Sequence, residues 1–338
     1  MKRALFLGIV FIVRYGMAQD VCIDDVFEVQ NIVFTKEIVA TLSSDYLEGR
    51  SIENKSIYRT QAYLESLFRT YHIKSYFDNY RVSYKVHDSL YGQNIVGVYR
   101  GNYRKKTALL IVANYDNIGI INDDEDRDTI YNGANDNATG VAALIQLVYL
   151  VNLAKPNDNI IFALTSGKKN SMVGAGFLAD TLKKYDYLKI RATMNLEMLG
   201  KPIKAASHHL LTLQDSSTNI ISLFNHYLGE EFLVKDTTEE NRNRSEHSAF
   251  QNVLQVPSVT ITSFNLINDD NFMTSADDIA NIDIDYLHKT IGRISYALLK
   301  IIDGNDKIIF EDPNVIKKDN HLVTKESLVQ GQKIMDLE

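Results

Sequence analysis

Two continuous apolar runs constrain the fold of this 338-residue chain most strongly. Residues 108–112 and 160–164 contain no polar side chain. A strand with one solvated face alternates apolar and polar residues, so an uninterrupted apolar strand is typical of a sheet that is covered on both faces. Longer helical patterns lie between such strands. The sequence therefore predicts an α/β fold, a three-layer α/β/α sandwich with a mostly parallel mixed central sheet.

The same periodicity places the individual elements. Strands are expected at residues 94–99, 108–114, 159–165, 192–198, 210–213 and 258–262. Helices are expected at 36–42 (with Thr35 as the N-cap), 56–71, 140–153, 175–185, 218–228 and 285–302. Residues 44–50 read as a polar turn between the first two helices.

The N-terminus has the pattern of a secretory signal peptide. Lys2 and Arg3 precede an apolar stretch at 4–13, and residues 16–18 offer small side chains for cleavage. Ten apolar residues are too few to span a bilayer. Arg14, directly after the apolar stretch, is atypical of a signal peptide, so an uncleaved membrane anchor is the alternative. We expect a signal peptide at 1–18, one domain at 19–303 and a charged C-terminal tail at 304–338. The mature protein is then secreted or periplasmic, without stable membrane insertion.

The net charge limits the classes of partner, and the cysteine content limits the disulfides. The net charge is −7, and removal of the signal peptide takes it to about −10. An acidic surface argues against nucleic acid and anionic membranes. Cys22 is the only cysteine, so no intramolecular disulfide can form.

Polar residues follow several of the expected strands. Asn114 and Asp116 follow one, Lys168 and Lys169 another, and Glu197 ends a third. In parallel α/β sheets, functional groups gather on loops at the carboxyl ends of strands. We therefore expect these side chains to meet.

Four ordered motifs carry a family resemblance. Residues 133–144 read Gly-Ala-Asn-Asp-Asn-Ala-Thr-Gly-Val-Ala-Ala-Leu, residues 195–200 read Asn-Leu-Glu-Met-Leu-Gly, and residues 245–250 read Ser-Glu-His-Ser-Ala-Phe. The fourth is the turn at 42–50, which ends in Leu-Glu-Gly-Arg. Over about residues 36–302, the chain resembles the di-zinc exopeptidase family of secreted aminopeptidases. Its relatives include glutaminyl cyclase, glutamate carboxypeptidase and the peptidase-like domain of transferrin receptor.

The resemblance implies a zinc site that has lost several ligands. Asp136 matches the bridging aspartate, and Glu197 replaces a later aspartate ligand. Asn114, Lys169 and Met273 stand at the positions of a histidine, a glutamate and a second histidine.

Two more positions bear on the reaction. Lys168 stands where the family has the glutamate that activates water, whereas Asp116 keeps the carboxylate behind the metal. Catalytic zinc needs three protein ligands and an open position. An ammonium group repels a dication and cannot act as a base. We therefore expect no cofactor, with zinc retained only if the site has been rearranged.

Charge balance suggests a role for the two lysines. Buried carboxylates are costly without counterions. We predict that Lys168 or Lys169 pairs with Asp136 or Glu197, the alternative being a solvated surface loop. The resemblance also places Ser245, Glu246, His247 and Phe250 in the cleft, the alternative for His247 being a packed or capping residue.

The leading hypothesis is a secreted metallopeptidase-like protein that binds a peptide or protein without hydrolysing it. The first alternative is an active zinc aminopeptidase with a rearranged or single-metal site. The second is a structural envelope protein with a vestigial cleft.

Overall fold

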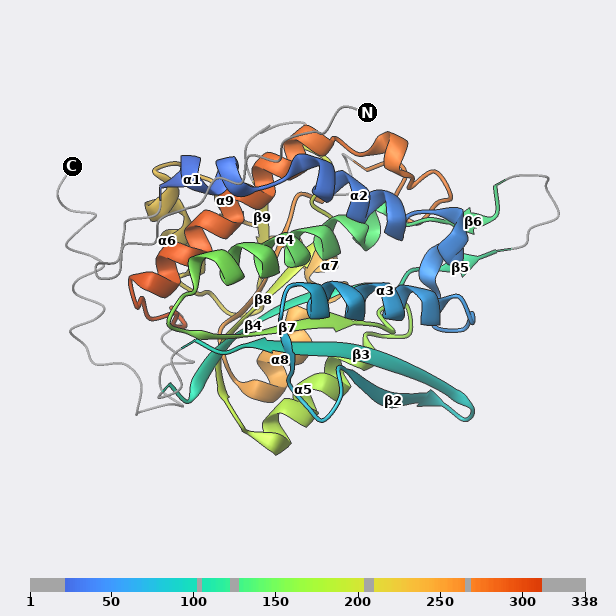
Figure 1. Ribbon diagram of the computed structural model, residues 1–338, viewed down its shortest axis with the longest axis horizontal. Coiled ribbons are helices and arrows are strands. Elements are labelled where there is room, and N and C mark those ends of the chain that lie inside the picture. Colours follow the sequence, from blue (N-terminus) through green and yellow to red (C-terminus); the bar gives the residue numbers. More distant parts are fainter. Residues whose placement is uncertain (1–21, 102–104, 122–127, 204–209, 265–268, 312–338) are drawn as a thin grey trace, which may run out of the picture.

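The computed structural model describes residues 22–101, 105–121, 128–203, 210–264 and 269–311 (Figure 1). The expected signal peptide lies outside the described residues, as does the expected tail beyond residue 311. The described chain forms one mixed nine-stranded sheet between two layers of helices, as the sequence predicts.

The sheet has the order β1-β3-β7-β4-β8-β11-β9-β10, and β2 pairs with β3 outside this path. Its centre is parallel, because β4 pairs in parallel with β7 and β8, and β8 with β11. The strands β3 and β9 run antiparallel to β7 and β11. The strands are β1 (Lys74–Ser75), β2 (Arg81–His87), β3 (Leu90–Tyr99), β4 (Thr107–Asn114), β7 (Asn159–Thr165), β8 (Lys189–Glu197), β9 (Leu210–Leu213), β10 (Leu233–Lys235) and β11 (Ser258–Thr262), with β5 (Gly119–Ile120) and β6 (Ile130–Tyr131) in a separate pair.

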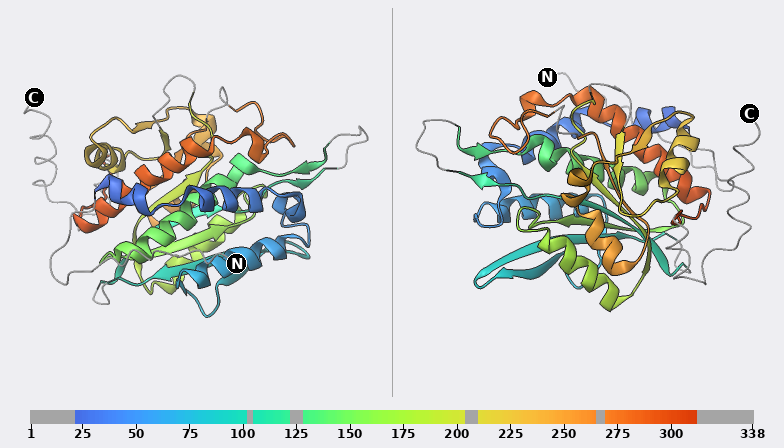
Figure 2. Two further views of the ribbon diagram at one scale, coloured as in Figure 1. Left: turned by 45° about the horizontal axis from the view of Figure 1, so that its top comes forward. Right: turned by 180° about the vertical axis from the view of Figure 1, so that it is seen from behind.

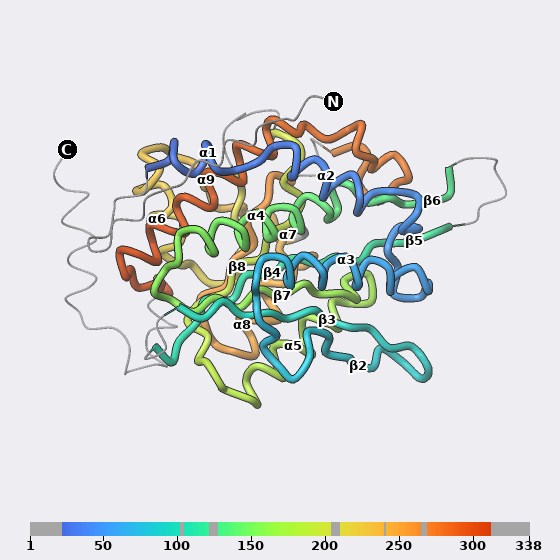
Figure 3. Tube along the Cα trace, viewed as in Figure 1, coloured from blue at the N-terminus to red at the C-terminus, as the bar shows by residue number. Residues whose placement is uncertain are grey.

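The helices cover both faces of the sheet. Figure 1 shows α2, α4 and α9 on one face, and α5 and α8 on the other. The reverse view in Figure 2 shows α5 and α8 side by side. The tube in Figure 3 shows the N-terminal helices α1 and α2 lying along α9. The helical elements are α1 (Ile23–Val29), α2 (Ile32–Leu42), η1 (Asp45–Arg50), α3 (Ile57–Thr70), η2 (Ala134–Ala138), α4 (Thr139–Ala154), α5 (Val173–Tyr185), α6 (Ile220–Leu228), α7 (Glu239–Asn243), α8 (His247–Leu254), η3 (Ile279–Asn281) and α9 (Ile284–Asp303).

The apolar run in β4 is explained by two cores. Leu109 and Ile111 belong to the core on the α4 face, whereas Leu110 and Val112 belong to the core on the α5 face. Successive strand residues point to opposite faces, so both sets must be apolar. One stretch of the described residues, Ala134–Ala154, is long and apolar enough to span a membrane, but its apolar window is 78% buried in this core.

One local prediction was wrong, and one hairpin was not predicted. The helix expected from residue 36 begins at Ile32, because the side chain of Asn31 caps it by accepting hydrogen bonds from Val33 N and Phe34 N. The hairpin of β2 and β3 was missed, except for the last six residues of β3. In β2 the apolar residues Val82 and Tyr84 alternate with polar ones, a signal for an edge strand.

Arg50 fastens the turn η1 to the loops that carry the site. Its side chain is buried, with 1% exposed, and its guanidinium donates to four backbone carbonyls. Nε donates to Tyr115 O at 2.8 Å, Nη1 to Asn132 O at 2.6 Å and Nη2 to Gly133 O at 2.9 Å. Nη1 also donates to Leu42 O. Burial lowers the pKa of Arg50 to about 10, which still leaves it charged at neutral pH.

We predict that Arg50→Met destabilises the protein by roughly 3–5 kcal/mol, because four buried carbonyls lose their donor. Urea unfolding measures the change. The matched control is Arg59→Met, since the Arg59 side chain is 47% exposed and its ion pair with Glu48 is 3.8 Å long. That variant should lose less than about 1 kcal/mol. Equal losses in the two variants would contradict this role of Arg50.

Candidate functional site

The carboxyl ends of three parallel strands bring the candidate residues together. β4 ends at Asn114, β8 ends at Glu197, and Lys168 and Lys169 follow β7. Because β4 lies between β7 and β8, these side chains converge on one edge of the sheet, as predicted. Asp136 reaches the same place from η2, which leads into α4.

The η2 turn has little room for other residues. Gly133 begins it with φ +59°, and a Cβ atom there would lie 2.1 Å from the Asn117 side chain. The carboxylate of Asp277 accepts hydrogen bonds from Asn135 N at 2.8 Å and Asp136 N at 2.9 Å. The backbone of Asp136 is thereby fixed, and its carboxylate faces the site.

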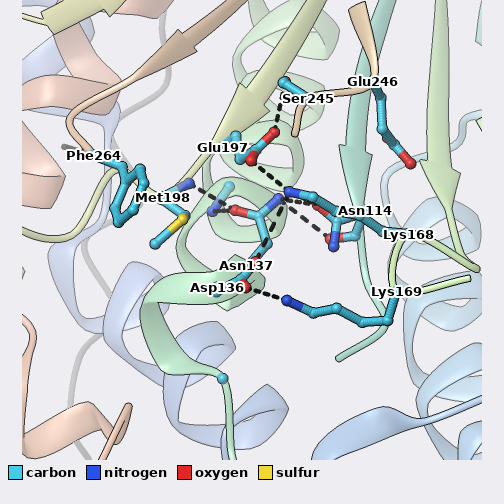
Figure 4. Close-up of polar contacts among 12 residues, drawn as sticks. Asn114, Asp136, Asn137, Lys168, Lys169, Glu197, Met198, Ser245, Glu246 and Phe264 are labelled. Atoms are coloured by element: carbon cyan, nitrogen blue, oxygen red, sulfur yellow. Dashed lines mark hydrogen bonds and ion pairs between the residues drawn. The ribbon is translucent and has the colours of Figure 1, made fainter. Parts of the chain in front are cut away.

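Asn137 ties the turn to the sheet, a role that the sequence did not reveal. Its Nδ2 donates to Asn114 Oδ1 at 3.0 Å and to Leu196 O at 3.0 Å. Its Oδ1 accepts from Met198 N at 2.8 Å and Gly140 N at 3.2 Å. One buried amide therefore joins β4, β8 and α4, and the contacts are visible in Figure 4. An asparagine in such a turn gives no sign of this in the sequence, since turns commonly contain asparagine.

Both lysines pair with carboxylates, which confirms the prediction from charge balance. Lys168 Nζ lies 2.5 Å from Glu197 Oε1 and 3.9 Å from Asp136 Oδ1. Lys169 Nζ lies 2.6 Å from Asp136 Oδ2. The Lys168 side chain is only 9% exposed and that of Lys169 22%, so the alternative of a solvated loop is wrong. Figure 4 shows both lysines approaching the carboxylates from the same side.

Asp116 holds the loop that carries the lysines. Its Oδ2 accepts hydrogen bonds from Gly167 N at 2.9 Å and Lys168 N at 3.1 Å. Gly167 has φ +74°, a left-handed conformation that favours glycine. Asn114 also contacts this loop, because its Oδ1 accepts a hydrogen bond from Lys168 Nζ at 3.4 Å.

The protonation of the site follows from burial and pairing. Burial disfavours the charged form of Lys168, but the carboxylates of Glu197 and Asp136 outweigh it and raise the Lys168 pKa. Burial alone would raise the pKa of Asp136. The Lys169 and Lys168 ammonium groups outweigh burial and lower this pKa below its ordinary value. Burial raises the pKa of Asp116 to about 6 and that of Glu246 to about 8. Pairing therefore favours the charged forms of Lys168 and Asp136 in spite of their burial.

The four residues expected in the cleft lie beneath it instead. Ser245, Glu246, His247 and Phe250 are each at most 1% exposed, and none lines the described cavity at the site. Ser245 Oγ donates to Glu197 Oε2 at 2.8 Å, and Glu246 Oε2 accepts from Thr165 Oγ1 at 2.7 Å. The reason is the helix α8, which packs Phe250 into the core on the α5 face.

His247 is a packed residue. Its ring is fully buried, with Nδ1 3.2 Å from Thr260 Oγ1 and Nε2 3.6 Å from Asp215 Oδ1. Met273, the last of the predicted site residues, lies at the cavity with its side chain more than half exposed and a left-handed backbone.

A cavity of about 200 Å³ opens over the lysine–carboxylate pairs. Its lining includes residues that sequence reasoning missed, because they lie in no recognised motif. These are Met172, Leu213, Asn241, Arg244, Thr262 and Phe264. Phe272 also lines the cavity, next to Met273 in the segment that the family resemblance covers.

Comparison with known proteins relates this geometry to a family. Residues 94–298 of the chain match the sequence model of the family described as Peptidase family M28. A probable zinc metalloprotease of the fungus Leptosphaeria maculans is 29% identical over 107 residues, which are 32% of this chain and 24% of that protein. The chain therefore matches about a quarter of the length of this curated relative.

Solved structures show the same fold. The LapA aminopeptidase of Legionella pneumophila has a TM-score of 0.66 at 15% identity, covering 83% of this chain and 74% of that one. A Zn-dependent exopeptidase from Parabacteroides distasonis has a TM-score of 0.63 at 17% identity, covering 80% and 97%. A glutaminyl cyclase of Bacteroides thetaiotaomicron has a TM-score of 0.62 at 15% identity, covering 81% and 97%.

The matched segment holds the η2 turn, the lysine loop after β7 and the end of β8, which meet at the site. It also holds the buried segment from Ser245 to Phe250 beneath them. By this match over more than half of its length, the chain belongs to peptidase family M28.

Proposed function

We propose that this family member binds a peptide or protein segment without hydrolysing it, and that it holds no zinc. One observation carries the proposal. The ammonium groups of Lys168 and Lys169 lie at hydrogen-bond distance from Glu197 and Asp136, the two carboxylates that the family resemblance assigns to metal.

The donor set at the site does not fit a catalytic zinc ion. Such an ion takes three nitrogen, oxygen or sulfur ligands and keeps an open position. Lys169 and Met273 supply an ammonium and a thioether at two of the expected ligand positions. At a third, Asn114 supplies an amide oxygen that already accepts hydrogen bonds from Asn137 and Lys168.

The site also has no base at the position where water would be activated. Lys168 stands there, and its pKa is raised by Glu197 and Asp136 against the effect of burial. A lysine that stays protonated cannot accept a proton from water. Glu197 is itself paired with Lys168 through Oε1 and accepts from Ser245 through Oε2, so both of its oxygens already have partners.

Binding is supported by the cavity that remains over these residues. It is about 200 Å³ in volume and has a largely apolar wall that includes Phe264, Phe272 and Leu213. Binding pockets combine such a wall with a few directed polar groups. Since the expected signal peptide precedes the described residues, we place this activity outside the cytoplasm as part of the same proposal. The net charge of −7 favours a peptide or protein partner over nucleic acid.

We predict that the purified full-length chain contains no stoichiometric zinc and does not hydrolyse aminoacyl p-nitroanilides, with or without added zinc. Elemental analysis and a chromogenic assay measure the two quantities. Stoichiometric zinc together with turnover that a chelator abolishes would show an active enzyme with a rearranged site.

We also predict that Asn114→His, Lys168→Glu, Lys169→Glu and Met273→His together create a zinc site, because they replace the two ammonium groups and supply imidazole and carboxylate ligands. Zinc titration of the folded variant measures this. The matched control adds Asp136→Asn to the same four changes and should lose the gained affinity. A folded quadruple variant without zinc affinity would mean that these positions do not face one metal site.

A further inference from the structure

The strand β2 forms a free edge of the sheet. Within the described part of the chain, β2 pairs with β3 alone, and no strand pairs with its other side. Figure 1 shows β2 at the outer margin of the sheet. It has seven residues, whereas the strand at the opposite edge, β10, has three. A free edge presents backbone N–H and C=O groups to which another extended chain can add.

The hydrogen bonds to β3 show which residues of β2 face outward. Val96 N of β3 donates to Tyr80 O at 2.8 Å, one residue before β2 begins. In an antiparallel pair, every second residue bonds to the partner strand, and the residues between turn their N–H and C=O away from it. The even-numbered residues of β2 therefore bond to β3, up to the bulge that follows Lys85. The outward-facing residues are Arg81, Ser83 and Lys85.

The carbonyl of Gln93 supports this register independently. Gln93 of β3 lies opposite Ser83. Its oxygen accepts hydrogen bonds from Tyr115 Oη at 2.6 Å and from Ser166 Oγ at 2.8 Å. These two residues follow β4 and β7, which lie on the other side of β3 from β2. The backbone of Gln93 therefore bonds away from β2, and the N–H and C=O of Ser83 face the free edge.

The α3 face of this edge offers an unpaired cation. Side chains of a strand alternate between its faces, so those of the outward-facing residues share one face. It is the α3 face, because Arg81 Nε lies 2.8 Å from Glu65 Oε2 of that helix. Glu65 already has a second partner, since Arg69 Nη2 lies 2.7 Å from its Oε1. Lys85 is exposed, and no carboxylate among the described residues forms an ion pair with it.

The α5 face of the edge is apolar and partly open. Val82 and Tyr84 point to this face, and Tyr84 packs on Phe177 of α5 with ring centroids 5.6 Å apart. Tyr84 is buried, but Val82 and Phe177 are only half-buried. Phe77, also half-buried, packs on the same core as Val82. A strand added to β2 can therefore cover apolar surface on this face.

We infer that the free edge of β2 binds an extended peptide in which acidic residues alternate with apolar residues. The peptide adds to the sheet as a further strand, through hydrogen bonds to the outward-facing backbone groups of β2. Its acidic side chains lie on the α3 face next to Lys85, and its apolar side chains lie on the α5 face next to Val82 and Phe177. This inference goes beyond the proposed function, because the edge is a surface apart from the cavity over Lys168 and Lys169.

A second copy of this chain is a poorer partner for the edge. A symmetric antiparallel pair centred on Ser83 would use all three outward-facing residues of each copy. It would set Arg81 of one copy opposite Lys85 of the other, twice. Like charges directly opposite each other destabilise a strand pair, and lysine on an edge strand commonly protects it from such pairing. The same lysine attracts a strand that carries a carboxylate at that position, so charge favours the acidic peptide.

Fluorescence anisotropy with labelled heptapeptide amides tests the inference on the purified full-length chain. The acidic probe is Thr-Val-Glu-Val-Glu-Val-Thr, and the basic probe has lysine in place of both glutamates. We expect the acidic probe to bind at least about fivefold more tightly, because an opposite charge replaces a like charge next to Lys85. Added salt should weaken binding of the acidic probe.

Two N-methylated forms of the acidic probe test the backbone pairing. In a strand added to β2, the residues whose side chains lie on the α3 face are those whose N–H groups bond to β2. N-methylation of both glutamates should therefore weaken binding at least about tenfold. N-methylation of the last two valines is the matched control. It should change the affinity less than about threefold, because those N–H groups face away from β2.

Variants of the chain assign the binding to β2. Ser83→Pro removes an outward N–H and none of the bonds to β3, so it should weaken binding of the acidic probe at least about tenfold. Lys85→Glu should reverse the preference between the acidic and basic probes. Its matched control is Lys289→Glu, because Lys289 is exposed on α9, which packs on α1 and α6, and the change in net charge is equal. If Ser83→Pro does not fold, Lys85→Glu at an exposed position still decides the matter.

Equal binding of the acidic and basic probes, unchanged binding after N-methylation of the glutamates, or no binding of any probe would overturn the inference. A wild-type dimer in sedimentation velocity that Lys85→Glu strengthens leaves it standing, since the variant removes the repulsion between copies. A wild-type dimer that Ser83→Pro dissociates would overturn it, because a second copy would then occupy the edge. Stoichiometric zinc would contradict the proposed function alone, since binding at β2 does not involve the metal positions.

Discussion

Buried negative charge is the constraint on which the arrangement of this site depends. The parallel strands and the η2 turn bring Asp136 and Glu197 to one edge of the sheet, where they are at most 7% exposed. A buried carboxylate without a partner costs several kcal/mol. The chain meets this cost with Lys168 and Lys169, which pair with the two carboxylates at 2.5 and 2.6 Å. In our proposal, the two lysines supply the positive charge that a metal ion supplies in the zinc-dependent relatives.

Hydrogen bonds of the surrounding residues fix the position of the loop that carries these ammonium groups. Asp116 accepts from two successive backbone amides of the loop after β7, and the left-handed Gly167 lets that loop turn back over the sheet. Arg50 and Asn137 hold the neighbouring loops through backbone carbonyls and amides. The lysines thus extend from a turn that is fixed at several points, which lowers the entropic cost of holding them at the carboxylates.

Much of this fold follows from the sequence, for physical reasons that also explain the failures. The strands β4 and β7 were predictable because burial on both faces requires continuous apolar residues. The edge strand β2 was missed because one solvated face dilutes its apolar signal. The pairing of the lysines was predictable from charge balance, once the family resemblance had placed Lys168, Lys169, Asp136 and Glu197 in one site. The roles of Arg50 and Asn137 were not, because they depend on which distant segments the fold brings together.

Diffraction at the zinc absorption edge, from crystals grown with excess zinc, tests the central claim most directly. The account predicts no anomalous peak at the site, with Lys168 Nζ on Glu197 and Lys169 Nζ on Asp136. An anomalous peak held by Asp136 and Glu197, with the two ammonium groups displaced from them, would contradict it.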